Sequence, residues 1–262
     1  MPETSYERVG SAAVLTITRP ERRNAVDAET AMGLRSGFDA FEADDDARVL
    51  ILCGEGPEAF CAGADLKALA EAVAAGIEPL DWLPRFADGP LGFTRLQASK
   101  PTIAAISGWC LAGGLELAIW CDLRIGTEDA KLGFTERRFG VPLIDGGTQR
   151  MPRIVGMGRA LEMILTGRIV EAEEAHSWGL LNEVVAPGTH LERALEMAEG
   201  LAAFPQTTML SDRQAALEGI GMPFAEGIAH EAELGRASVE TGTKGAARFA
   251  SGEGRGGQGS GV

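Results

Sequence analysis

Hydrophobic and polar positions in the first half of the chain follow two periods in turn. The alternating, β-branched run Val14–Thr18 predicts a strand, and the continuous apolar runs Val49–Cys53 and Pro101–Ser107 predict strands buried on both faces. Between the first two strands, apolar residues at helical spacing predict a helix from its N-cap Asp27 to about Glu42. Strands that alternate with helices in this way are typical of a layered α/β fold.

The same plan continues to about the middle of the chain and then changes. Asp65 is expected to cap an alanine-rich helix that begins at Leu66. Another helix is expected after Gly114, followed by a strand at 123–127. From Gly156 onward the pattern is almost wholly helical. The predicted helices are Arg159–Thr166, Glu171–Trp178, Leu191–Phe204, Thr207–Glu218 and Phe224–Val239.

These patterns divide the chain into three parts. We expect an α/β core at 1–200, a helical region for oligomerisation at 201–250 and a flexible, half-glycine tail at 251–262. The tail contains a literal G-x-G-x-x-G at 254–259, but it lacks the strand and helix that a dinucleotide site requires, so it is rejected. The proline- and glycine-rich segment 76–93 is either a packed surface loop or one wall of a substrate pocket.

Composition and charge limit the kinds of partner. The 262 residues are 45% hydrophobic and 24% charged, which is enough apolar material for a core without disulfides. The four cysteines are interpreted as reduced, mostly buried residues in a cytoplasmic protein, because they lack metal-ligand spacing and the chain lacks a signal segment or an 18-residue apolar run. The net charge of −14 argues against nucleic acid, yet local arginines and helix N-termini still suit a small anionic ligand.

Two short turns of small residues have the same layout. Ala62–Ala64 and Ala112–Gly114 each follow a predicted strand, and each opens a helix. Such turns expose backbone N–H groups that have no intrahelical acceptor, and a ligand oxygen can approach them closely. Two converging N–H groups would form an oxyanion hole. Each turn taken alone is also consistent with close packing of a helix on a strand.

Two glutamates add candidate proton-transfer chemistry. Glu116 lies in an apolar helical run, one turn after Gly113, where burial would raise its pKa into the range useful near neutral pH. Glu136 ends a short apolar strand, and its alternative interpretation is an exposed glutamate at a helix start.

Three motifs resemble those of the crotonase (enoyl-CoA hydratase/isomerase) superfamily. They are Phe60–Lys67, the segment Gly108–Asp122 with its Gly-Gly-x-Glu, and Gly146–Arg150. The resemblance extends from about Tyr6 to Phe249, with the motifs in the family's order and spacing. It implies a spiral of strand-strand-helix turns with a helical C-terminal trimerisation region, assembled as a homotrimer or a dimer of trimers.

The resemblance also implies a reaction and a site. The substrate would be an acyl-coenzyme A thioester, whose oxygen is held by the backbone N–H groups of Ala62 and Gly113. Glu116 would activate water and Glu136 would deliver a proton, so that a 2-trans-enoyl-CoA is hydrated. No cofactor is expected, since coenzyme A is part of the substrate, and neither nucleic acid nor membrane is an expected partner. The remaining residues expected to bind the substrate are Arg23, Ala25, Ala64, Asp65, Leu66, Gly114 and Phe249.

Some positions depart from the family pattern and leave alternatives open. The segment Val141–Thr148 differs from that of many hydratases and introduces Asp145, which is either a third catalytic carboxylate or the N-cap of a helix that begins at Gly146. Lysines that relatives place after Phe249 are missing, and the three histidines lie outside the motifs. The alternative functions are an enoyl-CoA double-bond isomerase, another acyl-CoA enzyme of the crotonase superfamily, and a non-catalytic acyl-CoA-binding protein.

Overall fold

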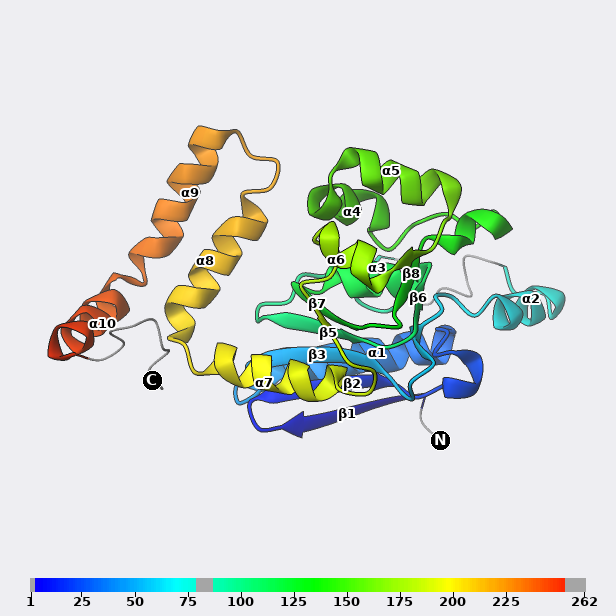
Figure 1. Cartoon of the computed structure of the whole chain (residues 1–262), viewed down its shortest axis with the longest axis horizontal. Coiled ribbons are helices and arrows are strands. Elements are labelled where there is room, and N and C mark those ends of the chain that lie inside the picture. The colour runs from blue at the N-terminus through cyan, green and yellow to red at the C-terminus, as the bar shows by residue number, and fades with distance from the viewer. Residues whose placement is uncertain (1–2, 79–86, 253–262) are drawn as a thin grey trace. The chain divides into compact units, whose positions relative to one another are not determined.

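The computed structural model describes residues 3–78 and 87–252 and divides the chain into two compact units, 1–198 and 199–262 (Figure 1). The strands are β1 (Thr4–Val9), β2 (Ala12–Ile17), β3 (Val49–Gly54), β4 (Ala59–Cys61), β5 (Thr102–Ile106), β6 (Trp109–Leu111), β7 (Leu123–Thr127), β8 (Lys131–Gly133), β9 (Val170–Glu171) and β10 (Glu183–Val185). The α-helices are α1 (Ala28–Ala43), α2 (Leu66–Ala74), α3 (Gly113–Trp120), α4 (Gly147–Val155), α5 (Met157–Thr166), α6 (Ala172–Ser177), α7 (His190–Ala202), α8 (Gln206–Glu218), α9 (Phe224–Arg236) and α10 (Val239–Ser251). Two 3-10 helices, η1 (Pro20–Arg22) and η2 (Thr135–Phe139), complete the described elements.

The first unit is built on two sheets. A six-stranded sheet has the order β1-β2-β3-β5-β7-β10, and a four-stranded sheet has the order β4-β6-β8-β9. Neighbouring strands are parallel except for β1 with β2 and β8 with β9. Figure 1 shows α1 alongside the larger sheet, α3 next to strands of both sheets, and α4 and α5 beyond α3.

Successive strand pairs wind between these two sheets. Each of the pairs β3/β4, β5/β6 and β7/β8 contributes its first strand to the six-stranded sheet and its second to the four-stranded sheet. The first two pairs are followed directly by a helix, α2 and α3. This repeated strand-strand-helix arrangement confirms the predicted fold class. It also places the ends of β4 and β6 side by side, because these two strands are neighbours in one sheet.

The strongest sequence signals correspond to real elements. All residues of β3 and β5 are buried, as their continuous apolar runs predicted. Asp27 caps α1 by accepting a hydrogen bond of 2.9 Å from the Thr30 N–H, and Asp65 caps α2 through Oδ1, which accepts from two backbone N–H groups. The four cysteines are buried, which confirms the expectation that most of them would be.

Several predictions require correction or extension. The helix expected after Gly114 begins at Gly113, and the residues Trp109–Leu111 before it form β6, which the sequence pattern did not indicate. The sequence pattern did not indicate β1 or β4, and it included α10 only within the predicted helical region 201–250 without separate bounds. Within the segment 76–93, Pro90 and Leu91 line a cavity, while 79–86 lies outside the described residues, as does 253–262 of the predicted tail.

The second unit is helical. Helix α7 crosses the boundary between the units, and α8, α9 and α10 follow. Its apolar side chains include several that are exposed in the single chain, such as Phe224, Ile228 and Val239. The role of this region in oligomerisation stays a prediction. Among the helices that the structure describes, none combines the length and the apolar character that a bilayer crossing demands.

Candidate active site

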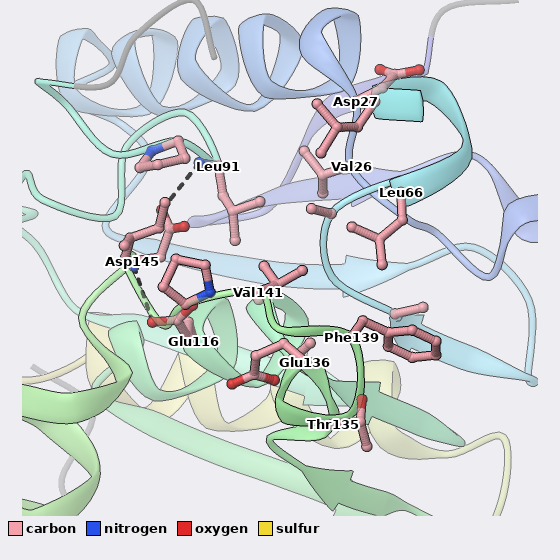
Figure 2. A pocket seen from close by; sticks show the side chains of 18 of the residues that line it. Val26, Asp27, Leu66, Leu91, Glu116, Thr135, Glu136, Phe139, Val141 and Asp145 are labelled. Atoms are coloured by element: carbon pink, nitrogen blue, oxygen red, sulfur yellow. Dashed lines mark hydrogen bonds between the residues drawn. The ribbon is translucent and has the colours of Figure 1, made fainter. Parts of the chain in front are cut away.

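A cavity of about 510 Å³ opens in the first unit where the two predicted turns lie (Figure 2). Apolar side chains from α2, from the segment around Leu91 and from 139–144 form much of its lining. Its acidic lining residues are Asp27, Glu116, Glu136 and Asp145, and among the described residues that line it there is no lysine, arginine or histidine. The cavity is therefore an apolar space with a few carboxyl groups.

The two turns follow β4 and β6 and touch each other. A Cβ atom at Gly113 would lie 3.5 Å from Gly63 Cα, which is ordinary van der Waals contact between the two backbones. Ala112 has φ 52° and ψ −125°, a conformation that residues with a side chain rarely adopt. At this turn the chain passes directly from β6 into α3. The first N–H groups of the helix, which have no intrahelical acceptor, therefore lie at the cavity.

The backbone N–H groups at the first turn are not equivalent. The Ala62 N–H donates to the Arg23 carbonyl at 3.0 Å, so the structure contradicts its predicted role as an oxyanion donor. Val26 pairs with the residues on either side of Ala64: its N–H donates to Gly63 O and its carbonyl accepts from the Asp65 N–H, both at 2.8 Å. Because successive N–H groups of an extended chain point to opposite sides, the Ala64 N–H points away from Val26, and Ala64 lines the cavity.

The second turn offers the N–H of Gly113. Gly113 is the first residue of α3, so its N–H has no acceptor within the helix, and it also lines the cavity. Ala64 and Gly113 are therefore the two backbone donors that the geometry favours. Gly114 has a packing role instead, because a Cβ atom there would lie 2.1 Å from the Cys61 carbonyl oxygen.

Glu116 lies on α3 with only 3% of its surface exposed. Its Oε1 accepts hydrogen bonds from the backbone N–H groups of Asp145, at 3.0 Å, and Gly147, at 2.7 Å. Burial raises the pKa of Glu116 to about 8, with further contributions from the charges of Asp145 and Glu136, while the two hydrogen bonds act in the opposite direction. The predicted burial of this glutamate is confirmed.

Glu136 lies on η2 and is 6% exposed, so the alternative of an exposed helix-start residue is wrong. Both of its carboxylate oxygens are buried and lack a hydrogen-bond partner among the described residues. Burial raises the pKa of Glu136 to about 7. An unpartnered buried carboxyl group is costly to ionise, which makes it suited to carry a proton near neutral pH.

The two glutamates occupy contrasting environments at one cavity. The N–H donors at Glu116 favour its ionised form, whereas Glu136 has no such donor among the described residues. The pKa of Glu116, about 8, is above that of Glu136, about 7, so near neutral pH a proton shared by the pair is held more tightly by Glu116. The order of the pKa values therefore does not identify the base, and Glu116 is favoured for that role by the two backbone N–H groups that stabilise its ionised form. The arrangement can supply a base at one position and an acid at the other.

Asp145 is not a helix N-cap. Helix α4 begins after Gly146, which has no capping side chain. The Asp145 carboxylate, 3% exposed, instead accepts hydrogen bonds from the Leu91 N–H at 3.1 Å and from the Thr94 hydroxyl. The sequence contained no sign of these partners, because they lie more than fifty positions away.

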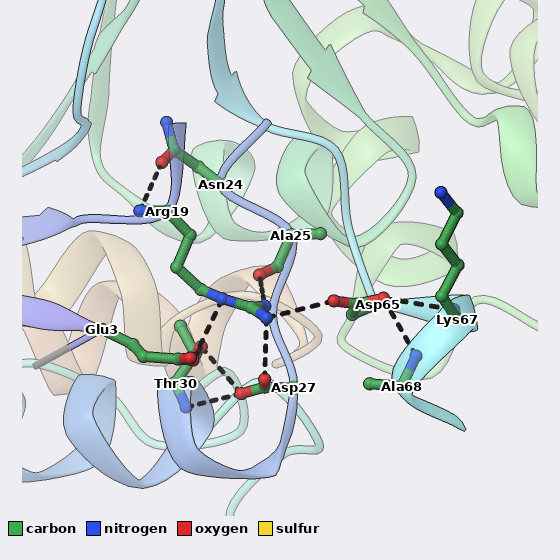
Figure 3. Close-up of polar contacts among 9 residues, drawn as sticks. All are labelled: Glu3, Arg19, Asn24, Ala25, Asp27, Thr30, Asp65, Lys67 and Ala68. Atoms are coloured by element: carbon green, nitrogen blue, oxygen red, sulfur yellow. Dashed lines mark hydrogen bonds and ion pairs between the residues drawn. The ribbon is translucent and has the colours of Figure 1, made fainter. Parts of the chain in front are cut away.

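A buried charge cluster that sequence reasoning missed supports the edge of the site (Figure 3). The Arg19 guanidinium forms ion pairs of 3.0 Å with Glu3, 2.9 Å with Asp27 and 3.1 Å with Asp65, and it also donates to the Ala25 carbonyl. Asp27 and Asp65 are the N-caps of α1 and α2. One cation thus fixes the starts of two helices that border the cavity.

The residues expected to bind coenzyme A fall into three groups. Arg23, Ala25, Ala64, Asp65 and Leu66 line a second hollow of about 410 Å³, together with Glu21, Arg22 and Lys67. Gly114 lies at the helix start described above. Phe249 belongs to α10 of the second unit, and its expected role stays a prediction. His176 and His230 contact the Leu181 carbonyl and Glu218, respectively, and none of the three histidines lines the cavity.

Comparisons with known proteins agree with this arrangement. Residues 7–251 match the family model described as enoyl-CoA hydratase/isomerase. The chain is 36% identical to the (E)-benzylidenesuccinyl-CoA hydratase of Thauera aromatica, with 87% of each protein covered. It is 34% identical to the short-chain-enoyl-CoA hydratase of Clostridium acetobutylicum, over 87% of this chain and 85% of that protein. The crystal structure of enoyl-CoA hydratase EchA1 from Mycobacterium marinum superposes with a TM-score of 0.85, 32% identity and 96% of each chain covered.

The chain therefore belongs to the enoyl-CoA hydratase/isomerase family, within the crotonase superfamily. It is an enzyme of the enoyl-CoA hydratase type, and an acyl-CoA thioester is the class of substrate that fits this family.

Proposed function

We propose that this enzyme reversibly hydrates a 2-trans-enoyl-CoA to a 3-hydroxyacyl-CoA. The observation that carries the proposal is the pair Glu116 and Glu136, two buried carboxyl groups of contrasting environment at one cavity. Addition of water to a conjugated double bond needs a base for the water and an acid for the carbon next to the carbonyl, and this pair supplies both.

The proposed hydration begins when the thioester binds at the two turns. The thioester oxygen accepts hydrogen bonds from the Ala64 and Gly113 N–H groups. Ionised Glu116 removes a proton from water while the water oxygen bonds to C3, and the double-bond electrons move toward the thioester oxygen to give an enolate. Protonated Glu136 then donates its proton to C2, the C2–H bond forms, and the carbonyl is restored. Proton exchange between the two glutamates and solvent returns the enzyme to its starting state.

The cavity favours an uncharged, apolar acyl group. Leu66, Leu69, Leu91, Val141 and Ile144 supply apolar surface, and the ionisable lining residues that the structure describes are all acidic. A carboxylate on the acyl chain would lose its hydration without gaining a cationic partner there. Because the relatives' names share the hydratase reaction but differ in the acyl group, the acyl class is argued from this cavity alone.

Binding of the rest of the substrate is proposed for the hollow lined by Arg22, Arg23 and Lys67. Three cations near the start of α2 suit the phosphates of coenzyme A, despite the net charge of −14. We further propose that the chain assembles as a homotrimer or a dimer of trimers in the cytoplasm. Neither the reaction nor these residues calls for a cofactor beyond the substrate.

The experiment follows the absorbance of the conjugated thioester of crotonyl-CoA and identifies the product by mass. We expect the absorbance to fall as one water is added, and Glu116→Gln and Glu136→Gln each to reduce kcat by about 10²- to 10⁴-fold. Glu173→Gln, the same change on the exposed side of α6, is the matched control and should leave the rate unchanged.

Two outcomes would contradict the proposal. One is conversion of a 3-enoyl-CoA to a 2-enoyl-CoA without water addition to any enoyl-CoA, which would identify a double-bond isomerase. The other is tight acyl-CoA binding with no turnover of short, long or aromatic enoyl-CoAs, which would identify a binding protein.

A further inference from the structure

We propose that Asp145 is a positioning residue for the proposed reaction: it fastens the cavity wall formed by Leu91 to the base Glu116 and places a negative charge beside that base. The inference rests on the proposed function and adds a role for a residue that does not itself move a proton in the mechanism above.

Asp145 connects two parts of the site through opposite ends of one residue. Its backbone N–H donates to Glu116 Oε1 at 3.0 Å. Its side-chain Oδ1 accepts from the Leu91 N–H at 3.1 Å and from the Thr94 hydroxyl. Figure 2 shows Asp145 between Leu91 and Glu116, with a dashed line to each. A displacement of the Asp145 side chain is therefore transmitted directly to the base.

The wall that Asp145 holds also lies over a proposed oxyanion donor. Leu91 is 3% exposed, lines the cavity, and its Cδ1 lies 2.8 Å from the position that a Cβ atom would occupy on Gly113. The same loop is fixed further away by the ion pair between Asp88 and Arg35 of α1. Asp145 thus holds the segment 88–94 at the end near Glu116, and the ion pair of Asp88 holds it at the other end.

Among the described residues no cation forms an ion pair with the Asp145 carboxylate, although burial raises the pKa of Asp145 and the charges of Arg95 and Arg150 lower it. Arg150 of α4 donates to the carbonyls of Asp145, at 2.9 Å, and Thr94, at 2.6 Å. Arg95 donates to the Ile144 carbonyl at 3.0 Å. Glu136 of η2 is the other acid that faces Glu116. The Asp145 carboxylate therefore adds negative charge beside Glu116, and its removal makes Glu116 easier to ionise.

The experiment uses two substitutions that separate shape from charge. Asp145→Asn keeps an oxygen acceptor for the Leu91 N–H and the Thr94 hydroxyl but removes the charge, whereas Asp145→Ala removes both. Glu116 is titrated by carbon-13 NMR in protein labelled at glutamate carboxyl carbons, with its signal assigned by its loss in Glu116→Gln. This readout is independent of turnover. Crotonyl-CoA hydration is measured on the same samples.

We expect Asp145→Asn to move the Glu116 titration midpoint to lower pH and to lower kcat less than Asp145→Ala does, because the hydrogen-bond acceptor is kept. Asp145→Ala should lower kcat by roughly 10- to 100-fold, as expected when a catalytic group shifts by a fraction of an ångström. Asp88→Asn, which loosens the same loop at its far anchor, should leave the Glu116 midpoint in place.

An unchanged Glu116 midpoint in both Asp145 variants would overturn the inference, as would parental kcat in Asp145→Ala. Failure of the proposed function is recognised separately: it appears as absence of hydration in the parent, or as full activity in Glu116→Gln, whatever the NMR titration gives.

Discussion

A Cβ atom at Gly63 would lie 2.8 Å from the backbone nitrogen of Gly113. Gly63 has φ +91°, which a residue with a side chain adopts only with strain. The two turns are thus in contact through a glycine whose missing side chain leaves room for the Gly113 N–H and for any oxygen bound to it. A side chain at position 63 would therefore disturb both the backbone conformation of the first turn and the proposed binding of the thioester oxygen.

Gly63→Ala is accordingly expected to reduce kcat for crotonyl-CoA by about 10²- to 10³-fold, the usual cost of losing one oxyanion donor. Its melting temperature should also fall. Gly158→Ala is the control, since a Cβ atom there meets nothing within 4 Å and α5 accommodates alanine readily. A Gly63→Ala enzyme that folds and retains parental kcat would exclude Gly113 as a donor.

The unusual conformation of Ala112 makes a second prediction. At φ 52° and ψ −125° alanine carries strain of about 1–3 kcal/mol, which glycine would not. Since glycine costs about 0.4–1 kcal/mol through the entropy of the unfolded chain, Ala112→Gly should raise the free energy of unfolding by about 1 kcal/mol. Urea denaturation measures this change. A loss of stability would mean that contacts of the alanine methyl group outweigh the backbone strain.

The burial of Glu136 predicts a pH-dependent difference in stability. Its folded-state pKa of about 7 is above the ordinary 4.5, so its contribution is fully present below pH 4.5 and is lost as the pH rises through 7. Relative to Glu136→Gln, the parent should lose up to about 3 kcal/mol of unfolding free energy between pH 4.5 and pH 8. Chemical denaturation of both proteins across this range tests it, and a constant difference would exclude an elevated pKa at Glu136.

Removal of the Arg19 cation should destabilise the fold at a distance from Glu116 and Glu136. Arg19→Met keeps much of the side-chain volume but leaves Glu3, Asp27 and Asp65 without their shared cation, so we expect a loss of about 3–5 kcal/mol in unfolding free energy at pH 7. Part of this loss should disappear at pH 4, where the carboxylates begin to protonate. Arg236→Met, at an exposed pair with Glu233, is the control and should change stability by less than about 0.5 kcal/mol.

The acidic, apolar lining of the cavity predicts discrimination between acyl groups. A 2-enoyl-CoA of six carbons should have kcat/KM at least roughly tenfold above that of the same chain ending in a carboxylate, because burying an unpaired charge is unfavourable. Leu69→Arg, which places a cation on the lining of α2, should reduce this ratio. Equal values for both substrates in the parent enzyme would contradict an uncharged acyl class.

The sequence predicted those features that depend on local patterns. The buried strand β3 could be recognised because six consecutive buried positions leave a continuous apolar run, and the caps of α1 and α2 because aspartate precedes each helical period. The paired glutamates and the small-residue turns were also evident, since they lie within short motifs.

Features fixed by distant partners could not be predicted in the same way. The choice between Ala62 and Ala64 as a donor depends on the pairing of the first turn with Val26, nearly forty positions earlier. Asp145 looked like a helix cap, and only the fold brings it to Leu91. Strands of three residues, such as β4 and β6, are too short to reveal a period.

Because β4 and β6 are neighbours in one sheet, the spacing of these strands sets the distance between the two proposed N–H donors. Adjacent strands are held about 4.8 Å apart by their hydrogen bonds, and each proposed donor follows one of these strands within a few residues. Two N–H groups that share one oxygen at about 2.9 Å can be at most about 5.8 Å apart, which is close to that strand spacing. The separation of the donors is therefore a property of backbone geometry rather than of side chains. Side chains on the cavity wall can then diverge to accept new acyl groups while the place where the thioester oxygen binds is preserved.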